Sequence, residues 1–228
     1  MDTLIFDCDG VLVDSEAIAE ATLVGLLGEW LPDLAADTVL RQALGMTTAN
    51  ILGHLEPLSR HRLPADATER VDRTIEARLA RELEAIDGVA AAIASLPLPK
   101  AVVSNSRRRR VLASLATTGL DRLIGESPVF TADQVAYPKP APDLYLLAAR
   151  ELGCAPADCL VVEDSVSGVT AAHAAGMTVI GFTGASHVEP GQARRLVEAG
   201  AWRILDHMHG LESMVDDWRH ARLRAAAR

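Results

Sequence analysis

The sequence of 228 residues has little cysteine, little lysine and no long apolar run. Its three cysteines, Cys8, Cys154 and Cys159, are odd in number and lack the spacing of a metal site, which indicates a reducing compartment. No apolar run approaches the length of a membrane span. The first strand pattern begins near Thr3, and we therefore expect no signal peptide and a cytoplasmic protein.

Acidic residues outnumber basic ones in this chain, by 31 to 22. The formal net charge is −9, which argues against general nucleic-acid binding. A small anionic substrate remains compatible with this charge, because a local cation can dominate a pocket. Apolar residues make up 49% of the sequence, which at this length is enough for one sizeable core of a globular protein.

The start of the chain is its most informative stretch, because an apolar strand pattern there ends in Asp7, Asp9 and Gly10. Side chains alternate along a strand, so Asp7 and Asp9 start out on the same side. Two carboxylates that lie close together repel each other unless a cation or a proton lies between them. Gly10 allows a sharp turn directly afterwards. An ordinary Asp-Gly turn is the alternative for these residues taken alone.

Two later segments carry groups suited to an anion. Ser104 and Asn105 follow the apolar run Lys100–Val103 and precede a helical pattern, whose free N–H groups point beyond the strand. A plain helix N-cap is the alternative. Lys139 lies between two prolines, on a stiff loop that is not helical. A solvated loop lysine is the alternative, although lysine is scarce and occurs only at positions 100 and 139.

A fourth segment ends in the adjacent acids Glu163 and Asp164, whose oxygens suit Mg²⁺, although an acidic pair can also cap a helix. With the motifs Asp7-Cys8-Asp9-Gly10-Val11, Ser104, Lys139 and Glu163-Asp164 in this order, the chain resembles the phosphatase branch of the haloacid dehalogenase superfamily. It looks most like the group of β-phosphoglucomutase and small sugar-phosphate phosphatases such as 6-phosphogluconate phosphatase.

Strand patterns recur along the chain and alternate with helical patterns rich in Ala and Leu. They lie at Thr3–Asp7, Lys100–Val103, Val129–Thr131, Leu160–Glu163, Val179–Phe182 and Arg203–Leu205. This alternation predicts an α/β fold with a parallel sheet that is covered on both faces. The resemblance makes this core a Rossmann-like, doubly wound sheet.

The interval between Ser15 and Ala85 has no convincing strand pattern. Helical patterns appear there instead, at residues 15–27, 36–42, 48–55 and 67–85. We therefore expect a small helical domain at residues 15–85, inserted into a core of residues 1–14 and 86–228, with hinges near Asp14-Ser15 and Ala85–Gly88.

The resemblance implies that this helical insertion is a cap. Its loop residues Gly45, Met46 and Thr47 would lean over the active site and contact the substrate. A simple connection, with Thr47 as the N-cap of the next helix, is the alternative.

The resemblance also implies a Mg²⁺-dependent phosphatase that acts on a small phosphorylated metabolite, a sugar or polyol phosphate. Asp7 would attack phosphorus to give an aspartyl-phosphate, and Asp9 would serve as general acid and then as general base. Mg²⁺ would bind at Asp7, at the carbonyl of Asp9 and at Asp164, with Glu163 in support.

The phosphate oxygens would be held by Ser104, the N–H of Asn105 and Lys139. The run Arg107–Arg110 forms no single basic face, because successive helical residues point about 100° apart. We interpret it as a solvated helix start and leave open whether one of its side chains reaches the substrate. We expect no nucleic-acid or membrane partner, and a monomer or weak homodimer.

Three other functions on the same fold fit these residues less well than a phosphatase does. A dehalogenase has no use for a second acid at Asp9. A phosphomutase of the β-phosphoglucomutase type is the closer alternative, but its cap offers a His and an Arg where this chain has Ala19 and Thr48. A non-enzymatic protein of the same fold would have no physical need for clustered charges, so Asp7, Asp9, Lys139 and Asp164 argue against it.

Overall fold

The computed structural model describes residues 1–35 and 48–226. The chain divides into two compact units, one of Met1–Asp14 with Glu84–Arg228 and one of Ser15–Leu83, and each is described by itself. The predicted loop Gly45-Met46-Thr47 and the helical pattern at residues 36–42 lie outside the described residues.

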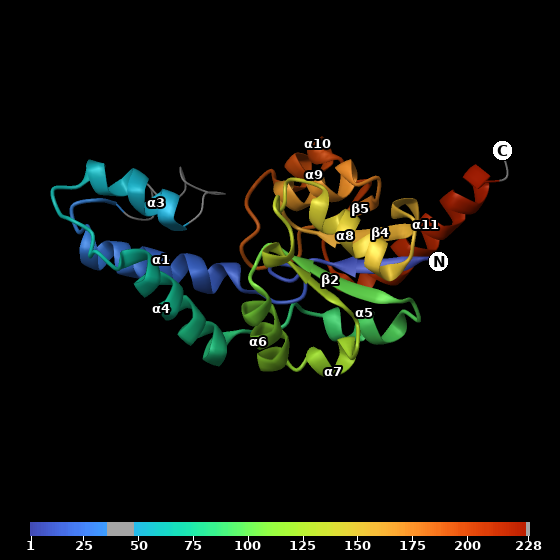
Figure 1. Cartoon of the computed structure of the whole chain (residues 1–228), viewed down its shortest axis with the longest axis horizontal. Coiled ribbons are helices and arrows are strands. Elements are labelled where there is room, and N and C mark those ends of the chain that lie inside the picture. Colours follow the sequence, from blue (N-terminus) through green and yellow to red (C-terminus); the bar gives the residue numbers. More distant parts are fainter. Residues whose placement is uncertain (36–47, 227–228) are drawn as a thin grey trace. The chain divides into compact units, whose positions relative to one another are not determined.

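The first unit is built on a six-stranded parallel sheet (Figure 1). Its strands are β1 (Thr3–Phe6), β2 (Lys100–Ser104), β3 (Val129–Thr131), β4 (Cys159–Glu163), β5 (Thr178–Phe182) and β6 (Arg203–Leu205). The strand order is β3-β2-β1-β4-β5-β6, so the chain winds outward from β1 in one direction and then in the other. This confirms the predicted doubly wound α/β fold, and each predicted strand ends within one residue of the observed one.

Helices cover both faces of this sheet (Figure 1). On one face lie α8 (Asp143–Leu152), α9 (Val166–Ala174) and α10 (Gln192–Ala199). On the other lie α5 (Val89–Ser95), α6 (Arg108–Thr118) and α7 (Asp121–Ile124), with α11 (Leu211–Ala226) packed beside α5.

Strands β1, β2, β4 and β5 are largely buried because each carries an apolar run that fills both faces. Ile5, Val103 and Val161 belong to the core under α8 and α9, whereas Leu4 and Phe6 alternate with Ile5 and are equally buried. Full burial of such a side chain contributes about 1.5–3 kcal/mol. These interior strands therefore hold their carboxyl ends, and the residues that follow them, firmly in place.

The second unit contains α1 (Glu16–Trp30), α3 (Thr48–Leu55) and α4 (Ala67–Glu82). Val71, Ile75 and Leu79 recur every fourth residue and form the buried face of α4, which packs against α1. Within the two described ranges, no helix has both the length and the apolar character that crossing a membrane requires.

The predicted helix that ends at Ala85 is wrong in its last residues, because α4 ends at Glu82. Ala85 instead forms an antiparallel bridge with Val13. The N–H of Asp14 donates to the carbonyl of Glu84, and the N–H of Ile86 donates to the carbonyl of Leu12, both at 3.0 Å. These long-range backbone bonds favour extended chain over another helical turn.

Candidate active site

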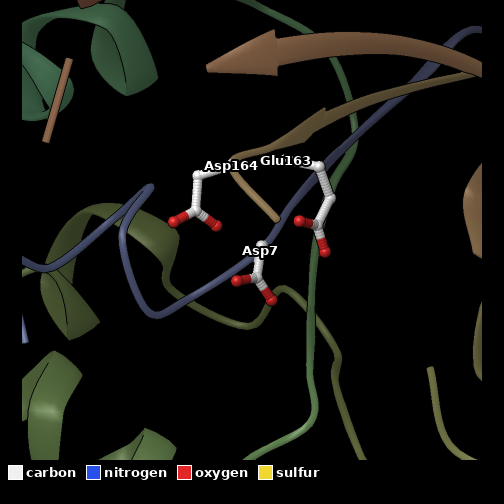
Figure 2. Close-up of side chains that lie close together, drawn as sticks. All are labelled: Asp7, Glu163 and Asp164. Atoms are coloured by element: carbon white, nitrogen blue, oxygen red, sulfur yellow. The ribbon is translucent and has the colours of Figure 1, made fainter. Parts of the chain in front are cut away.

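Three buried carboxylates meet where the neighbouring strands β1 and β4 end (Figure 2). Phe6 pairs with Val162, and the N–H of Asp7 donates to the carbonyl of Val162 at 3.0 Å. Asp7 therefore lies beside Glu163 and Asp164, with one carboxylate oxygen of each within 4.8 Å of the others. The strand order reverses between β1 and β4, and open α/β sheets bind ligands at this point.

Two glycines allow these carboxylates to lie against the backbone. Gly10 has φ +77°, and a Cβ there would lie 2.0 Å from Oδ2 of Asp164. A Cβ on Gly168, in α9, would lie 1.7 Å from Oε1 of Glu163. Any side chain at either position would therefore displace a carboxylate of the site.

Lys139 brings a positive charge to this cluster. Its Nζ lies 2.7 Å from Oδ1 of Asp7 and 2.6 Å from Oε1 of Glu163, and it donates to the carbonyl of Val103 at 2.9 Å. Only 3% of its side chain is exposed, so the solvated-loop alternative is wrong. Burial alone would lower the pKa of Lys139, but Asp7 and Glu163 outweigh burial and raise it well above its usual value. The ammonium therefore stays charged.

Asn105 holds the backbone of Lys139 in place. Its Nδ2 donates to the carbonyl of Lys139, and the N–H of Lys139 donates to Oδ1 of Asn105, both at 3.0 Å. This reciprocal pair joins the residue after β2 to the proline-rich loop. The side chain of Asn105 thus positions the lysine, while phosphate binding by its N–H stays a prediction.

The carboxylate of Glu163 is fully engaged by the protein. Oε1 accepts hydrogen bonds from Lys139 and, at 3.1 Å, from the hydroxyl of Tyr145 in α8. Oε2 accepts from the N–H and the hydroxyl of Ser165, both at 3.0 Å. Asp7 and Asp164 are therefore better placed than Glu163 to give an oxygen to a cation.

Asp9 makes its contacts with the connection between β2 and α6. Its Oδ2 accepts from the hydroxyl of Ser106 at 2.7 Å and from that of Ser104 at 3.5 Å, and its Oδ1 lies 3.4 Å from Nη2 of Arg110. Asp9 and Ser104 were predicted from the sequence as site residues, but Ser106 was not. A solvated helix start is the wrong interpretation for Arg110, although Arg107 is exposed as expected.

The positions of Ser106 and Arg110 explain why these two were missed. Arg110 lies in the first turn of α6, and Ser106 precedes this helix by two residues, in the connection from β2. Nothing in the local sequence relates these two residues to Asp9, which lies 101 residues from Arg110 in the sequence. His187 was missed for the same reason, and its Nε2 lies 3.3 Å from Oδ2 of Asp164.

The carboxylate cluster has more negative than positive charge. Burial raises the pKa of Asp7 well above its usual value, Lys139 lowers it, and Glu163 and Asp164 raise it again. With all groups ionised, three carboxylates and one ammonium leave two negative charges in excess. One divalent cation would neutralise them, and carboxylate oxygens are donors that Mg²⁺ prefers. The residues therefore fit the metal that the resemblance implies.

The fold and the site define a doubly wound α/β enzyme whose acidic centre lies at the switch point of its sheet. Residues 1–176 match the family model of the haloacid dehalogenase-like hydrolases, and the chain belongs to this family. It is 30% identical to 6-phosphogluconate phosphatase of Escherichia coli (strain K12) over 191 residues, which cover 83% of this chain and 86% of that protein.

Two further comparisons agree with this assignment. The chain is 33% identical to fructose-1-phosphate phosphatase YqaB of Escherichia coli (strain K12) over 181 residues, which cover 78% of this chain and 94% of that one. A crystal structure of a haloacid dehalogenase-like protein of unknown function from Agrobacterium tumefaciens str. C58 has a TM-score of 0.86 at 39% identity, covering 95% of this chain and 98% of that one. The chain is thus a phosphatase of this family, as its four motifs predicted.

Proposed function

We propose that this phosphatase hydrolyses a small sugar or polyol phosphate in a Mg²⁺-dependent reaction that passes through an aspartyl-phosphate. The observation that carries the proposal is the buried group of Asp7, Lys139 and Asp164 at the ends of β1 and β4. The names of two relatives, 6-phosphogluconate phosphatase and fructose-1-phosphate phosphatase, support the substrate class.

Asp7 is the proposed nucleophile. Its carboxylate would form a bond to phosphorus as the ester bond to the leaving oxygen breaks, and water would then cleave the aspartyl-phosphate. The reaction requires Asp7 to be ionised, although burial favours its neutral form. Lys139, 2.7 Å from Oδ1, opposes that effect of burial and keeps the carboxylate oriented.

Asp9 is the proposed general acid and base. It would give its proton to the leaving oxygen in the first step and take a proton from water in the second. Ser106 and Arg110 would hold its carboxylate while no substrate is bound. Because Arg110 belongs to α6 and Ser106 to the segment that leads into it, a shift of this helix would change the orientation of Asp9.

Mg²⁺ would be held by the carboxylates of Asp7 and Asp164 and by the carbonyl of Asp9, with Glu163 in support through Lys139. When bound, it would supply charge that screens the repulsion between the nucleophile and the phosphate. Ser104, the N–H of Asn105 and Lys139 would hold the phosphate oxygens. The hydroxyl of Ser104 already accepts from the N–H of Ser106 at 3.0 Å, which fixes its position.

The helical unit Ser15–Leu83 is the proposed cap. The core residues described above account for phosphate chemistry, which is common to all phosphate esters, so the choice among sugars needs groups from elsewhere. Gly45, Met46 and Thr47 remain the proposed substrate loop of this unit. We also keep a cytoplasmic location and a monomer or weak homodimer as predictions, the latter to be checked by sedimentation velocity.

The test is a screen of the purified protein against phosphorylated sugars and polyols, with released inorganic phosphate as the readout. The proposal expects release in Mg²⁺, loss of activity in excess EDTA, and loss of activity in Asp7→Asn. Asp121→Asn, at the exposed start of α7, is the matched control and should keep wild-type turnover. If a sugar phosphate were converted to an isomer with little release of free phosphate, the proposed phosphatase activity would be wrong and a mutase activity would be indicated.

A further inference from the structure

A second cluster of reactive groups lies at the opposite end of β4 from the active site. Cys159 is the first residue of β4 and is buried, and Cys154 follows the end of α8 and is half-buried. Their Sγ atoms are 3.3 Å apart, and both are free thiols. Cys8 lies beyond the other end of β1, whose first residue Thr3 pairs with Cys159.

A hydrogen-bonded turn brings the two sulfurs together. Gly153 ends α8 with φ +64°, and the N–H of Cys154 then donates to the carbonyl of Ala149 at 3.1 Å. The short helix η4 (Pro156–Asp158) turns the chain directly into β4. A disulfide has an S–S distance of about 2.05 Å, so closure needs the sulfurs to approach by about 1.3 Å, which small side-chain rotations can supply.

We propose that Cys154 and Cys159 are a redox-sensitive pair that forms an intramolecular disulfide when the protein meets hydrogen peroxide. In the first step the sulfur of Cys154 attacks the peroxide, the O–O bond breaks, and a sulfenic acid and one water form. In the second step the sulfur of Cys159 attacks the sulfenic sulfur, the S–O bond breaks, and a second water leaves. The two thiols supply the two electrons that reduce the peroxide.

The surroundings of the two thiols assign their roles. Cys154 is the more accessible, so it meets the oxidant first. Cys159 is buried, so peroxide reaches it less readily than Cys154. Its sulfur lies 3.3 Å from that of Cys154, and it therefore stands next to the sulfenic sulfur once that has formed. Cys159 is thus the resolving thiol, and it captures Cys154 before further oxidation to the irreversible sulfinic acid.

The pair is separated from the reacting groups by the length of β4. Glu163 lies four residues beyond Cys159, about 13 Å along a strand that rises about 3.3 Å per residue. Closing the disulfide ties the end of α8 to the start of β4 and leaves the carboxylates in place. We therefore expect the oxidised protein to keep phosphatase activity within about twofold of the reduced protein, so the inference does not depend on which phosphate ester is hydrolysed.

The test treats the full chain with hydrogen peroxide, removes the oxidant, and counts thiols in denaturant. The three thiols of the reduced wild-type protein should fall to one, the intact mass should drop by two hydrogens, and dithiothreitol should restore all three. Peptide mapping should place the link between Cys154 and Cys159. Persistence of three thiols, a link to Cys8, or disulfides only between copies of the chain would each overturn the proposal.

Matched single variants separate the two roles. Cys154→Ser should form no disulfide and keep its two remaining thiols, because the accessible thiol is gone. Cys159→Ser should form no disulfide either, but Cys154 should gain oxygen irreversibly, as sulfinic or sulfonic acid. Reversal of these two patterns would overturn the assignment. Circular dichroism checks that each variant is folded. If one variant is not folded, the thiol count of the wild-type protein still decides whether the disulfide forms.

Discussion

Replacing Lys139 by methionine tests the charge balance of the buried cluster. Methionine keeps an unbranched side chain of similar length but has no ammonium. The variant leaves Asp7 and Glu163 without the cation that lies 2.7 Å and 2.6 Å from them, and it removes the donor to the carbonyl of Val103. Both carboxylates are at least nine-tenths buried, so water cannot take over the role of the ammonium.

The structure sets the size of the expected loss. Removal of one partner from a buried ion pair costs about 3–5 kcal/mol, because the other charge is left uncompensated. For a chain of this length each kcal/mol corresponds to about 2–4 °C, so Lys139→Met should lower Tm by about 6–20 °C at pH 7 in the absence of metal. Phosphatase activity should fall by at least about a hundredfold, because in the proposed mechanism the lysine would also hold phosphate oxygens on which charge develops.

The loss of stability should depend on pH in a defined direction. Burial already raises the pKa of Asp7 in the wild type, and loss of the ammonium, which lowers it, should raise it further. A carboxyl group whose pKa is higher in the folded state stabilises the protein below its unfolded pKa, near 3.8, and loses this contribution as pH rises through the folded value. The gap in Tm between wild type and variant should therefore widen as pH rises from about 4 to about 8.

The assay is thermal unfolding followed by circular dichroism in EDTA, with phosphate release in Mg²⁺ measured separately. Lys100→Met is the matched control, because Lys100 is the other lysine of the sequence and, among the described residues, donates to the main-chain carbonyls of Leu96 and Leu98 and to no carboxylate. It should cost no more than about 1–2 kcal/mol and keep wild-type turnover. A Tm of Lys139→Met within about 2 °C of wild type across this pH range would refute the reasoning on the buried charges.

Four further outcomes follow from the site. Asp7→Asn should lower turnover by at least about a thousandfold in a folded protein, and more than about a tenth of wild-type activity would exclude the covalent route. Asp164→Ala should raise the Mg²⁺ concentration needed for half-maximal activity, and Ca²⁺ should inhibit the wild type; full activity in EDTA would contradict the metal site. Arg110→Met should lower kcat by about tenfold or more with little change in KM, because in the proposed mechanism Arg110 acts through Asp9. Arg109→Met, at an exposed position, should change neither kcat nor KM, and equal effects of the two variants would remove Arg110 from the mechanism. Inorganic phosphate should appear at the rate at which a sugar phosphate disappears, and a shortfall matched by an isomeric sugar phosphate would favour the mutase.

The local pattern of the sequence was sufficient for the strands and for the acids that follow them. Strands β1, β2, β4 and β5 each contain a short apolar run, and such runs are stable inside a sheet that is covered on both faces. Asp7 directly follows such a run, and Glu163 and Asp164 stand at the end of another, but they were named as site residues only through the four ordered motifs and the resemblance that these carry. Their position at strand ends is a local property and needs no knowledge of strand order.

Only the tertiary structure determines the contacts between segments that are distant in the sequence. The pairing of β1 with β4 brings Asp7 to Glu163, and the burial of Lys139 depends on both, although 132 residues separate Lys139 from Asp7. A lysine is normally exposed, so its burial follows from its partners and not from its own neighbours in the chain.

The contacts of Arg110 with Asp9 and of Ala85 with Val13 have the same origin. In both, a local preference was overridden, for a solvated helix start in the first and for one more helical turn in the second. A weak local propensity yields when a partner from another segment offers a hydrogen bond or an ion pair, because such propensities amount to less than about 1 kcal/mol per residue.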